Sequence, residues 1–156
     1  NLGNLVSSLF LEQADKNLNA ICVINFGGLR ASINKGKVTM GDAYKLLPFD
    51  NYLVIVKLPK NALKEMKDWI LKSGGHPFAG FKIIEGEIKT TNNLEFPNED
   101  FWVVTNDYLM NGGDNATFFT QKLEVINTNI LLRDLFIDKI KGKTLVDNKE
   151  QRLIVK

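Results

Sequence analysis

The sequence contains one cysteine, Cys22, and one histidine, His76, among its 156 residues. A single cysteine excludes an internal disulfide and a zinc site built from cysteines. A single histidine excludes a two-metal hydrolase centre that is built on several imidazoles. A Ser-His-Asp arrangement is not credible either, because the sequence has no nucleophile-elbow motif. Cys22 lies in an apolar run and is predicted to be a small core residue, whereas His76 lies in a loop and is predicted to be solvated.

An excess of one charge is also lacking, because 20 basic and 18 acidic residues leave a formal net charge of +2. This near balance gives no reason to expect a nucleic-acid groove or binding to an anionic membrane. No apolar run approaches the roughly 20 residues that span a bilayer. We therefore expect no nucleic-acid partner and no membrane span.

The glycine pairs lack the spacing of the common phosphate-binding motifs. They form neither a phosphate loop nor a dinucleotide fingerprint. A carboxylate pair, for instance Asp107 with Asp114, is formally possible, but nothing in the sequence places the two across a substrate bond. We predict no catalytic residue, no cofactor and no metal ligand in this chain.

The composition, 44% hydrophobic and 24% charged, is that of a globular protein. The length fits one domain, residues 1–156, that buries its own core. Hydrophobic periodicity and breaker residues predict helices over residues 2–16, 43–47, 61–71 and 130–141, the last one capped by Thr128 or Asn129. Strands are predicted over 20–24, 37–40, 52–58, 101–105, 123–126 and 153–155, with a hairpin over 81–88. This order favours an α+β fold, a mixed β-sheet flanked by helices.

The stretch from Thr105 to Asp114 organises the rest of the chain. It follows a strand-like apolar run and passes into a turn at Gly112 and Gly113, where the backbone can adopt positive φ and approach a ligand closely. Tyr108 offers an aromatic face and Asp114 a carboxylate, which suits a nucleoside with a flat base and hydroxyl groups. The alternative is that Tyr108 packs on its own loop and the glycines form an ordinary turn.

Two more loops have the composition of a ligand site. In residues 25–30, Arg30 follows Gly27 and Gly28 and can present a planar fork to a phosphate or carboxylate. In residues 47–51, Phe49 follows a proline that fixes the backbone. Taken alone, Arg30 is more simply a surface residue and Phe49 a core residue.

Four motifs in register resemble a known family: NLGNL (1–5), NFGGLR (25–30), GD with LPF (41–42 and 47–49), and TNDY with GGD (105–108 and 112–114). Over nearly the whole chain, they resemble the C-terminal domain of the 5′-nucleotidase family. That family also includes UDP-sugar hydrolases and 2′,3′-cyclic-nucleotide phosphodiesterases. The resemblance implies the fold of that domain and a role in nucleotide recognition.

The resemblance also implies a role for each site residue. Phe49 and Tyr108 would sandwich the base, and Arg30 would contact a phosphate. Asn25 would contact base or ribose, and Asp114 would accept hydrogen bonds from the ribose hydroxyls. Gly112 and Gly113 would be the close-approach glycines, and Gly27 and Gly28 would also belong to the substrate-binding site.

The sequence departs from the family pattern at a few positions. Phe26 stands where a small residue is usual and would narrow the pocket or add a stacking face. Asp50 replaces a common glycine and would place a negative charge near the base. Tyr108 replaces a phenylalanine and keeps the ring, and Asn115 follows Asp114 where glycine is frequent. These departures bear on which base and phosphate are preferred.

Family enzymes place hydrolysis in an N-terminal metallophosphoesterase domain with two metal ions, and a large domain rotation brings the substrate to the metals. That domain is absent from this chain, so the resemblance implies a metallophosphoesterase partner in cis or in trans, with divalent metal ions in that partner. It also implies an extracytoplasmic location: periplasmic, secreted or surface-anchored. No signal-peptide pattern occurs in the given sequence. The alternatives are a stand-alone nucleotide-binding module and an interaction domain whose pocket has degenerated.

Overall fold

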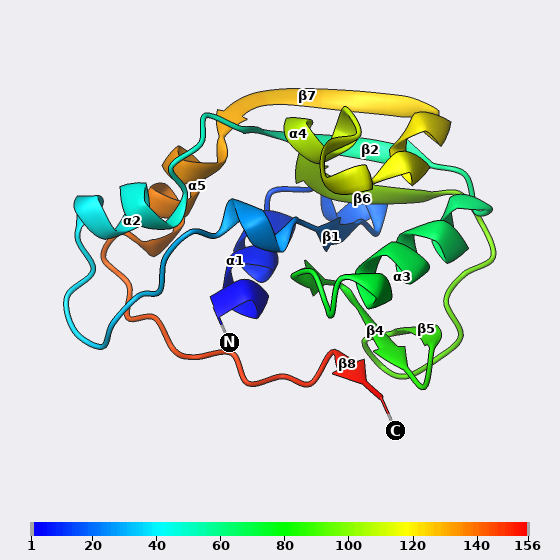
Figure 1. Ribbon diagram of the computed structural model, residues 1–156, viewed down its shortest axis with the longest axis horizontal. Coiled ribbons are helices and arrows are strands. Elements are labelled where there is room, and N and C mark those ends of the chain that lie inside the picture. Colours follow the sequence, from blue (N-terminus) through cyan, green and yellow to red (C-terminus); the bar gives the residue numbers. More distant parts are fainter. Residues whose placement is uncertain (1, 156) are drawn as a thin grey trace.

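The computed structural model describes residues 2–155 and has a mixed α and β architecture (Figure 1). The helices are α1 (Leu2–Leu11), α2 (Met40–Leu46), α3 (Ala62–Lys72), α4 (Asp107–Met110) and α5 (Leu132–Ile140). Short 3₁₀ turns are η1 (Lys16–Leu18), η2 (Phe26–Gly28), η3 (Gly113–Asn115) and η4 (Thr117–Gln121). The strands are β1 (Ile21–Val23), β2 (Tyr52–Leu58), β3 (Phe78–Ala79), β4 (Phe81–Ile84), β5 (Glu87–Thr90), β6 (Phe101–Asn106), β7 (Glu124–Leu131) and β8 (Leu153–Ile154).

Within residues 2–155 the strands form two sheets. The larger has five strands in the order β3-β1-β6-β2-β7, and the smaller has three in the order β5-β4-β8. In the larger sheet β1 and β6 run parallel, whereas β2 is antiparallel to both β6 and β7. The predicted mixed sheet flanked by helices is confirmed.

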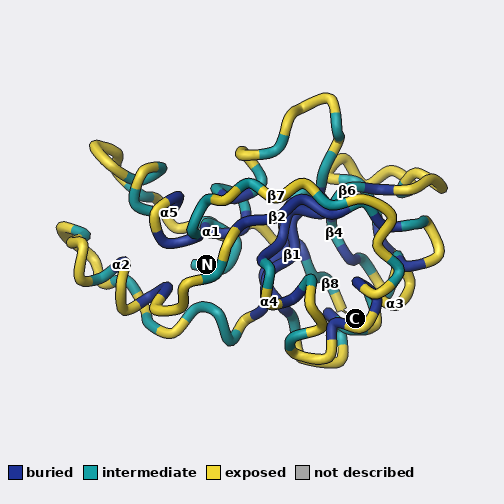
Figure 2. The backbone as a smooth tube through the Cα atoms, turned by 90° about the horizontal axis from the view of Figure 1, so that it is seen from above, coloured by how far each residue is buried: buried dark blue, intermediate teal, exposed yellow. Residues whose placement is uncertain are grey.

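The central strands are buried on both faces, and alternate residues therefore enter different cores. Val54 and Val56 belong to a cluster with Met66 of α3 and the aromatic residues of η4. Leu53 and Ile55 belong to the opposite cluster, with residues of α1, α2 and α5. Figure 2 shows β1 and β2 as a buried centre surrounded by exposed loops. Cys22 is fully buried in the second cluster, as predicted, and burial raises the pKa of its thiol.

Several predicted elements are confirmed with close bounds. The strand over residues 52–58 has the predicted limits. The hairpin turns at Glu85 and Gly86, which both have positive φ, and β8 adds to the edge of β4 as a terminal strand. Helix α3 buries Met66 and Ile70, pairs Lys64 with Asp68 on its exposed side, and ends before the glycines.

Two predictions, a strand and a helix cap, are wrong for local reasons. The predicted strand over residues 37–40 does not form, because Thr39 caps α2: its hydroxyl accepts from the Asp42 amide, and the Asp42 carboxylate accepts from the Thr39 amide. Neither Thr128 nor Asn129 caps α5, because β7 continues to Leu131. The Thr128 hydroxyl instead donates to the Leu53 carbonyl of β2, at 2.6 Å.

The first helix is shorter than predicted and ends at Leu11 instead of Lys16. Beyond it the Asp15 side chain accepts a hydrogen bond from the Asn17 amide and begins η1. Asn19 then adopts a left-handed conformation, which turns the chain into β1. A short polar side chain that bonds the local backbone competes with helix continuation.

Arg152 joins the two ends of the described chain. It is 6% exposed, and its guanidinium donates to the Asn4 carbonyl, the Ser7 and Ser8 hydroxyls of α1, and the Phe78 carbonyl. The Glu150 carboxylate pairs with its Nε at 2.8 Å. One buried cation therefore holds together α1, β3 and the segment that leads into β8.

We expect Arg152→Met to lower the free energy of unfolding by roughly 2–4 kcal/mol, because several buried acceptors lose their donor at once. Urea denaturation followed by circular dichroism measures this change. Lys149→Met, at an exposed position nearby, is the control and should stay within about 0.5 kcal/mol. Equal stability of the two variants would contradict the role of Arg152.

Candidate functional site

The sheet topology brings the three predicted loops to one edge. Strands β1 and β6 are parallel neighbours, with Cys22 opposite Val104, so the segments that follow them leave the sheet on the same side. Strand β2 runs antiparallel to β6, with Leu53 opposite Asn106. The loop that precedes β2 and carries Phe49 therefore meets the same edge. Separate stretches of sequence thus converge on one place.

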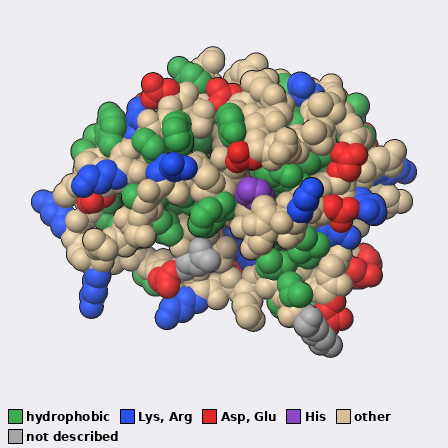
Figure 3. All heavy atoms as spheres, viewed as in Figure 1, with side chains coloured by type: hydrophobic (Ala, Val, Ile, Leu, Met, Phe, Trp, Pro, Cys, Tyr) green, Lys and Arg blue, Asp and Glu red, His purple; other side chains and the backbone are tan. Residues whose placement is uncertain are grey.

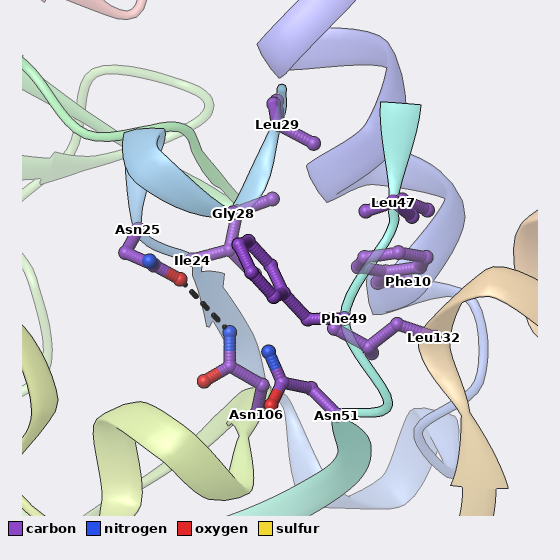
Figure 4. Close-up of a pocket in the computed structure, with 10 residues that line it drawn as sticks. All are labelled: Phe10, Ile24, Asn25, Gly28, Leu29, Leu47, Phe49, Asn51, Asn106 and Leu132. Atoms are coloured by element: carbon purple, nitrogen blue, oxygen red, sulfur yellow. Dashed lines mark hydrogen bonds between the residues drawn. The ribbon is translucent and has the colours of Figure 1, made fainter. Parts of the chain in front are cut away.

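The glycine turn after β1 is fixed by a pair of asparagines. Asn25 is 5% exposed, and its Oδ1 accepts from Nδ2 of Asn106 at 3.1 Å (Figure 4). Oδ1 of Asn106 in turn accepts from the Leu109 amide and caps α4. A Cβ on Gly28 would lie 3.1 Å from Oδ1 of Asn25, so the backbone passes close to this amide. The predictions missed Asn106; an asparagine directly before a helical turn is a cap signal that could have indicated it.

Phe49 closes a small hollow above this turn. Figure 4 shows its ring directed toward Gly28, with Phe10, Leu47 and Leu132 behind it. The hollow measures about 10 Å³, room for about one water molecule. The Cζ atom of Arg30 lies 5.9 Å from the centre of the Phe49 ring, and the Arg30 amide donates to the Leu46 carbonyl at 2.9 Å. Arg30 and Phe49 are therefore neighbours, as a shared site requires.

The Tyr108–Asp114 loop is folded back on itself. The Tyr108 hydroxyl donates to Oδ1 of Asp114 at 2.9 Å, and the Asp114 amide donates to the same hydroxyl oxygen at 3.3 Å. The hydrogen bond to Asp114 raises the pKa of the Tyr108 phenol. A Cβ on Gly113 would lie 2.5 Å from the Tyr108 ring, so this ring rests on bare backbone. Gly112 has φ 92° and Asp114 has φ 51°, which gives the sharp turn predicted at the glycines.

The two loops also approach each other. A Cβ on Gly27 would lie 3.7 Å from the Asn25 amide nitrogen and 3.9 Å from Oδ2 of Asp114. Asp107, by contrast, plays a different role, because its Oδ1 accepts from the Tyr52 amide at 3.1 Å and ties the loop to β2. Asp107 thus bonds a backbone amide of β2, whereas Asp114 bonds the Tyr108 hydroxyl. Among residues 2–155 no three His, Cys, Asp or Glu side chains gather as a metal-binding group.

The prediction of a solvated His76 is wrong. The residue is 9% exposed, and its ring stacks on Trp69 with centroids 3.7 Å apart and planes 11° from parallel. Its Nδ1 accepts from the Phe26 amide at 3.0 Å. Burial lowers the pKa of the imidazole, and the Asp114 charge opposes this effect in part. Figure 3 shows the imidazole in a hollow near the middle of one face of the molecule.

Two departures from the family pattern acquire a structural meaning. Asp50 does not present an uncompensated charge, because its carboxylate pairs with Arg133 at 2.9 Å. The Arg133 guanidinium also lies over the Tyr44 ring at 4.3 Å. Phe26 is 66% exposed and does not line the hollow beneath Phe49, so it does not narrow that space. Whether it adds a stacking face stays a prediction.

The fold is that of an α+β domain with a mixed sheet, and this cluster of loops lies at one edge of the sheet. A family model described as "5'-nucleotidase, C-terminal domain" matches residues 1–95, and the chain belongs to that family. The trifunctional nucleotide phosphoesterase protein YfkN of Bacillus subtilis is 28% identical over 163 residues, covering 90% of this chain and 11% of its own length. A probable 5′-nucleotidase of Treponema pallidum is 50% identical over 46 residues, covering 29% of this chain and 8% of its own.

A solved structure agrees with this assignment. The crystal structure of a 5′-nucleotidase precursor from Thermus thermophilus superposes with a TM-score of 0.83 at 28% identity, covering 99% of this chain and 35% of that one. This chain therefore spans about a third of that protein and about a tenth of the Bacillus subtilis protein. No helix within residues 2–155 is long and apolar enough to cross a membrane.

Gly113 lies against the Tyr108 ring, so we expect an added side chain to cost more stability at Gly113 than at Gly27. We expect Gly113→Ala to lower the free energy of unfolding by about 1–3 kcal/mol, because the added methyl displaces the ring. Gly27→Ala is the matched control, since its Cβ meets atoms at ordinary contact distances. Chemical denaturation of both variants measures the difference. An equal loss of unfolding free energy in the two variants would show that the Tyr108 ring moves aside without an energetic cost.

Proposed function

We propose that this chain recognises a nucleotide or nucleoside for a 5′-nucleotidase-type phosphohydrolase and positions it for a two-metal catalytic domain. The observation that carries the proposal is the convergence of two half-exposed rings, Phe49 and Tyr108, with a free arginine and a carboxylate at one edge of the sheet. Large apolar side chains that remain exposed together commonly mark a binding surface. The family assignment supports the same conclusion.

The base would lie between the two rings. Phe49 is 47% exposed and Tyr108 is 44% exposed. One face of Tyr108 rests on Gly113, which leaves the other face for a ligand. Asn51 borders both the hollow beneath Phe49 and the one beside Tyr108, which supports placing the base between the two rings. Such a clamp accepts any base, because every base offers a π-face.

The ribose would bind Asp114. Its Oδ1 is engaged by the Tyr108 hydroxyl, whereas no hydrogen bond from residues 2–155 reaches Oδ2. The oxygen left free lies near Gly27, where the small residue keeps the approach open. A carboxylate with one oxygen held and one free is oriented to accept from vicinal hydroxyls. Asn25 would add an amide contact to base or ribose.

The phosphate would bind Arg30. The other arginines, Arg133 and Arg152, are buried and each is bonded to a carboxylate. Arg30 is exposed, and its guanidinium has no hydrogen bond or ion pair within the described part of the chain. A planar guanidinium beside an aromatic ring can make two charge-assisted bonds to phosphate oxygens. Arg30 is therefore the residue that would distinguish a nucleotide from a nucleoside.

Hydrolysis would belong to the metallophosphoesterase domain, in cis or in trans, with its divalent metal ions. The residues described here do not offer a metal cluster, and their proposed role is to bind and orient the substrate. We infer on family grounds that the chain forms one domain and acts outside the cytoplasm; immunoblots of fractionated cells test the location. A stand-alone nucleotide-binding module is the alternative. A metallophosphoesterase sequence in the same or the neighbouring reading frame would argue against it.

We expect Tyr108→Ala to weaken adenosine binding by roughly 5- to 150-fold, the loss of about 1–3 kcal/mol of stacking. Isothermal titration without metal measures the affinity. Tyr108→Phe is the matched control and should lose less affinity than the alanine variant, because the ring remains and only the hydroxyl that holds Asp114 is removed. Unchanged affinity in the alanine variant would remove the base clamp from the proposal.

Arg30→Gln should weaken AMP binding about tenfold or more and leave adenosine nearly unaffected, because a charge-assisted contact to phosphate is lost. The same titration compares the two ligands. Lys45→Gln, which removes an exposed cation on α2, is the control for a general change of charge. An equal loss for AMP and adenosine would contradict a phosphate role for Arg30.

A further inference from the structure

A stacked aromatic pair lies behind the two loops of the proposed site. Trp69 belongs to α3 and packs edge-on against Phe118, with ring centroids 5.5 Å apart. His76 follows α3 and stacks on the Trp69 ring at 3.7 Å. The carbonyl of the next residue, Pro77, accepts from the Ile24 amide at 3.0 Å and fixes the histidine beside the end of β1. The pair is therefore anchored to the core and to the sheet.

Each ring makes one hydrogen bond to a different loop. Nδ1 of His76 accepts from the Phe26 amide of the glycine turn at 3.0 Å. Nε1 of Trp69 donates to the Asp114 carbonyl at 2.9 Å. We propose that His76 and Trp69 are positioning residues that set the glycine turn and the Asp114 loop at a fixed separation, and so orient the groups that contact the nucleoside. This inference rests on the proposed function for the identity of the ligand.

The bond to Phe26 requires a neutral imidazole, because Nδ1 must keep its lone pair and the proton must sit on Nε2. The charged groups around the ring are Asp114 from η3, and Glu150 and Arg152, which line the same hollow from the C-terminal segment. Asp114 favours the imidazolium, and burial disfavours it more strongly, so the pKa lies below its ordinary value. The neutral form, and the hydrogen bond with it, therefore predominates at neutral pH and is lost as the pH falls through the lowered pKa.

The first test uses the ligand-free protein. In ¹H–¹⁵N spectra recorded from about pH 7.5 down to the lowest pH at which the protein stays folded, the Phe26 amide should shift with the same midpoint as the His76 ring protons. In His76→Asn the amide should not titrate in this range, because the asparagine Oδ1 can replace Nδ1 as acceptor and does not ionise. If the Phe26 amide shift does not follow the titration of His76, the coupling is overturned, whether or not any nucleoside binds.

The second test measures adenosine affinity over the same pH range. Adenosine is used because a nucleotide phosphate titrates near pH 6. Wild type should lose roughly three- to tenfold of its affinity on acidification, about the value of one hydrogen bond. His76→Asn should keep its affinity throughout, and His76→Leu should be weak already at about pH 7.5. Equal weakening of Asn and Leu variants would refute the acceptor role.

Trp69→Phe tests the other half of the pair. It keeps a ring for His76 to stack on and removes the donor to the Asp114 carbonyl, so adenosine affinity should fall about three- to tenfold. Trp102→Phe is the control, since Trp102 packs beside Lys57 on the sheet. A loss in Trp69→Phe no larger than in the control would overturn the role of Trp69. If no variant or wild type binds adenosine while the Phe26 amide still titrates with His76, the proposed ligand is wrong and the positioning role stands.

Discussion

The parallel pairing of β1 with β6 is the constraint on which the rest of the molecule depends. It places the ends of two strands that are far apart in the sequence next to each other, with Cys22 beside Val104. Each strand then passes into a glycine-containing turn at the same edge of the sheet. Because both strands are buried on both faces, helices must cover the sheet on both sides, and the binding groups are confined to its edge. The architecture and the location of the site thus have one cause.

Much of the fold could be predicted because local and global signals agree. The uninterrupted β-branched run of β2 and the glycine turn of the 81–88 hairpin admit few alternatives. Predicted boundaries were wrong where one side-chain hydrogen bond determines where a helix or strand begins or ends. Asp42 reaches back to Thr39 and converts a strand-like stretch into a helix cap, and Thr128 bonds across to β2 and lets β7 continue. Such bonds depend on which backbone group is within reach, which composition and periodicity do not reveal.

In the site, too, features that belong to one loop could be predicted, and contacts between separate segments could not. Its glycines, rings and charges could be proposed from the sequence, because each loop carries its own chemical pattern. The contact between Asn25 and Asn106 could not, since these residues are far apart in the sequence and meet through the pairing of β1 with β6. The His76–Trp69 stack could not either, since it depends on how the chain folds back onto α3 after the glycines. His76 in particular follows two glycines and precedes a proline, a context typical of an exposed loop. Its burial comes from Trp69, whose helical pattern gives no indication of this neighbour.

The Arg152 contacts affect which segments of the molecule are released together in local unfolding. The arginine holds α1 against β3, and α1 contributes Phe10 to the floor of the hollow under Phe49. These contacts link the C-terminal segment, α1 and the aromatic wall of the site. Amide hydrogens of α1 would exchange at a rate governed by release of the Arg152 segment, instead of by fraying of the helix itself. Proteolytic cleavage just before Arg152 would then loosen a ligand surface that lies on another part of the chain.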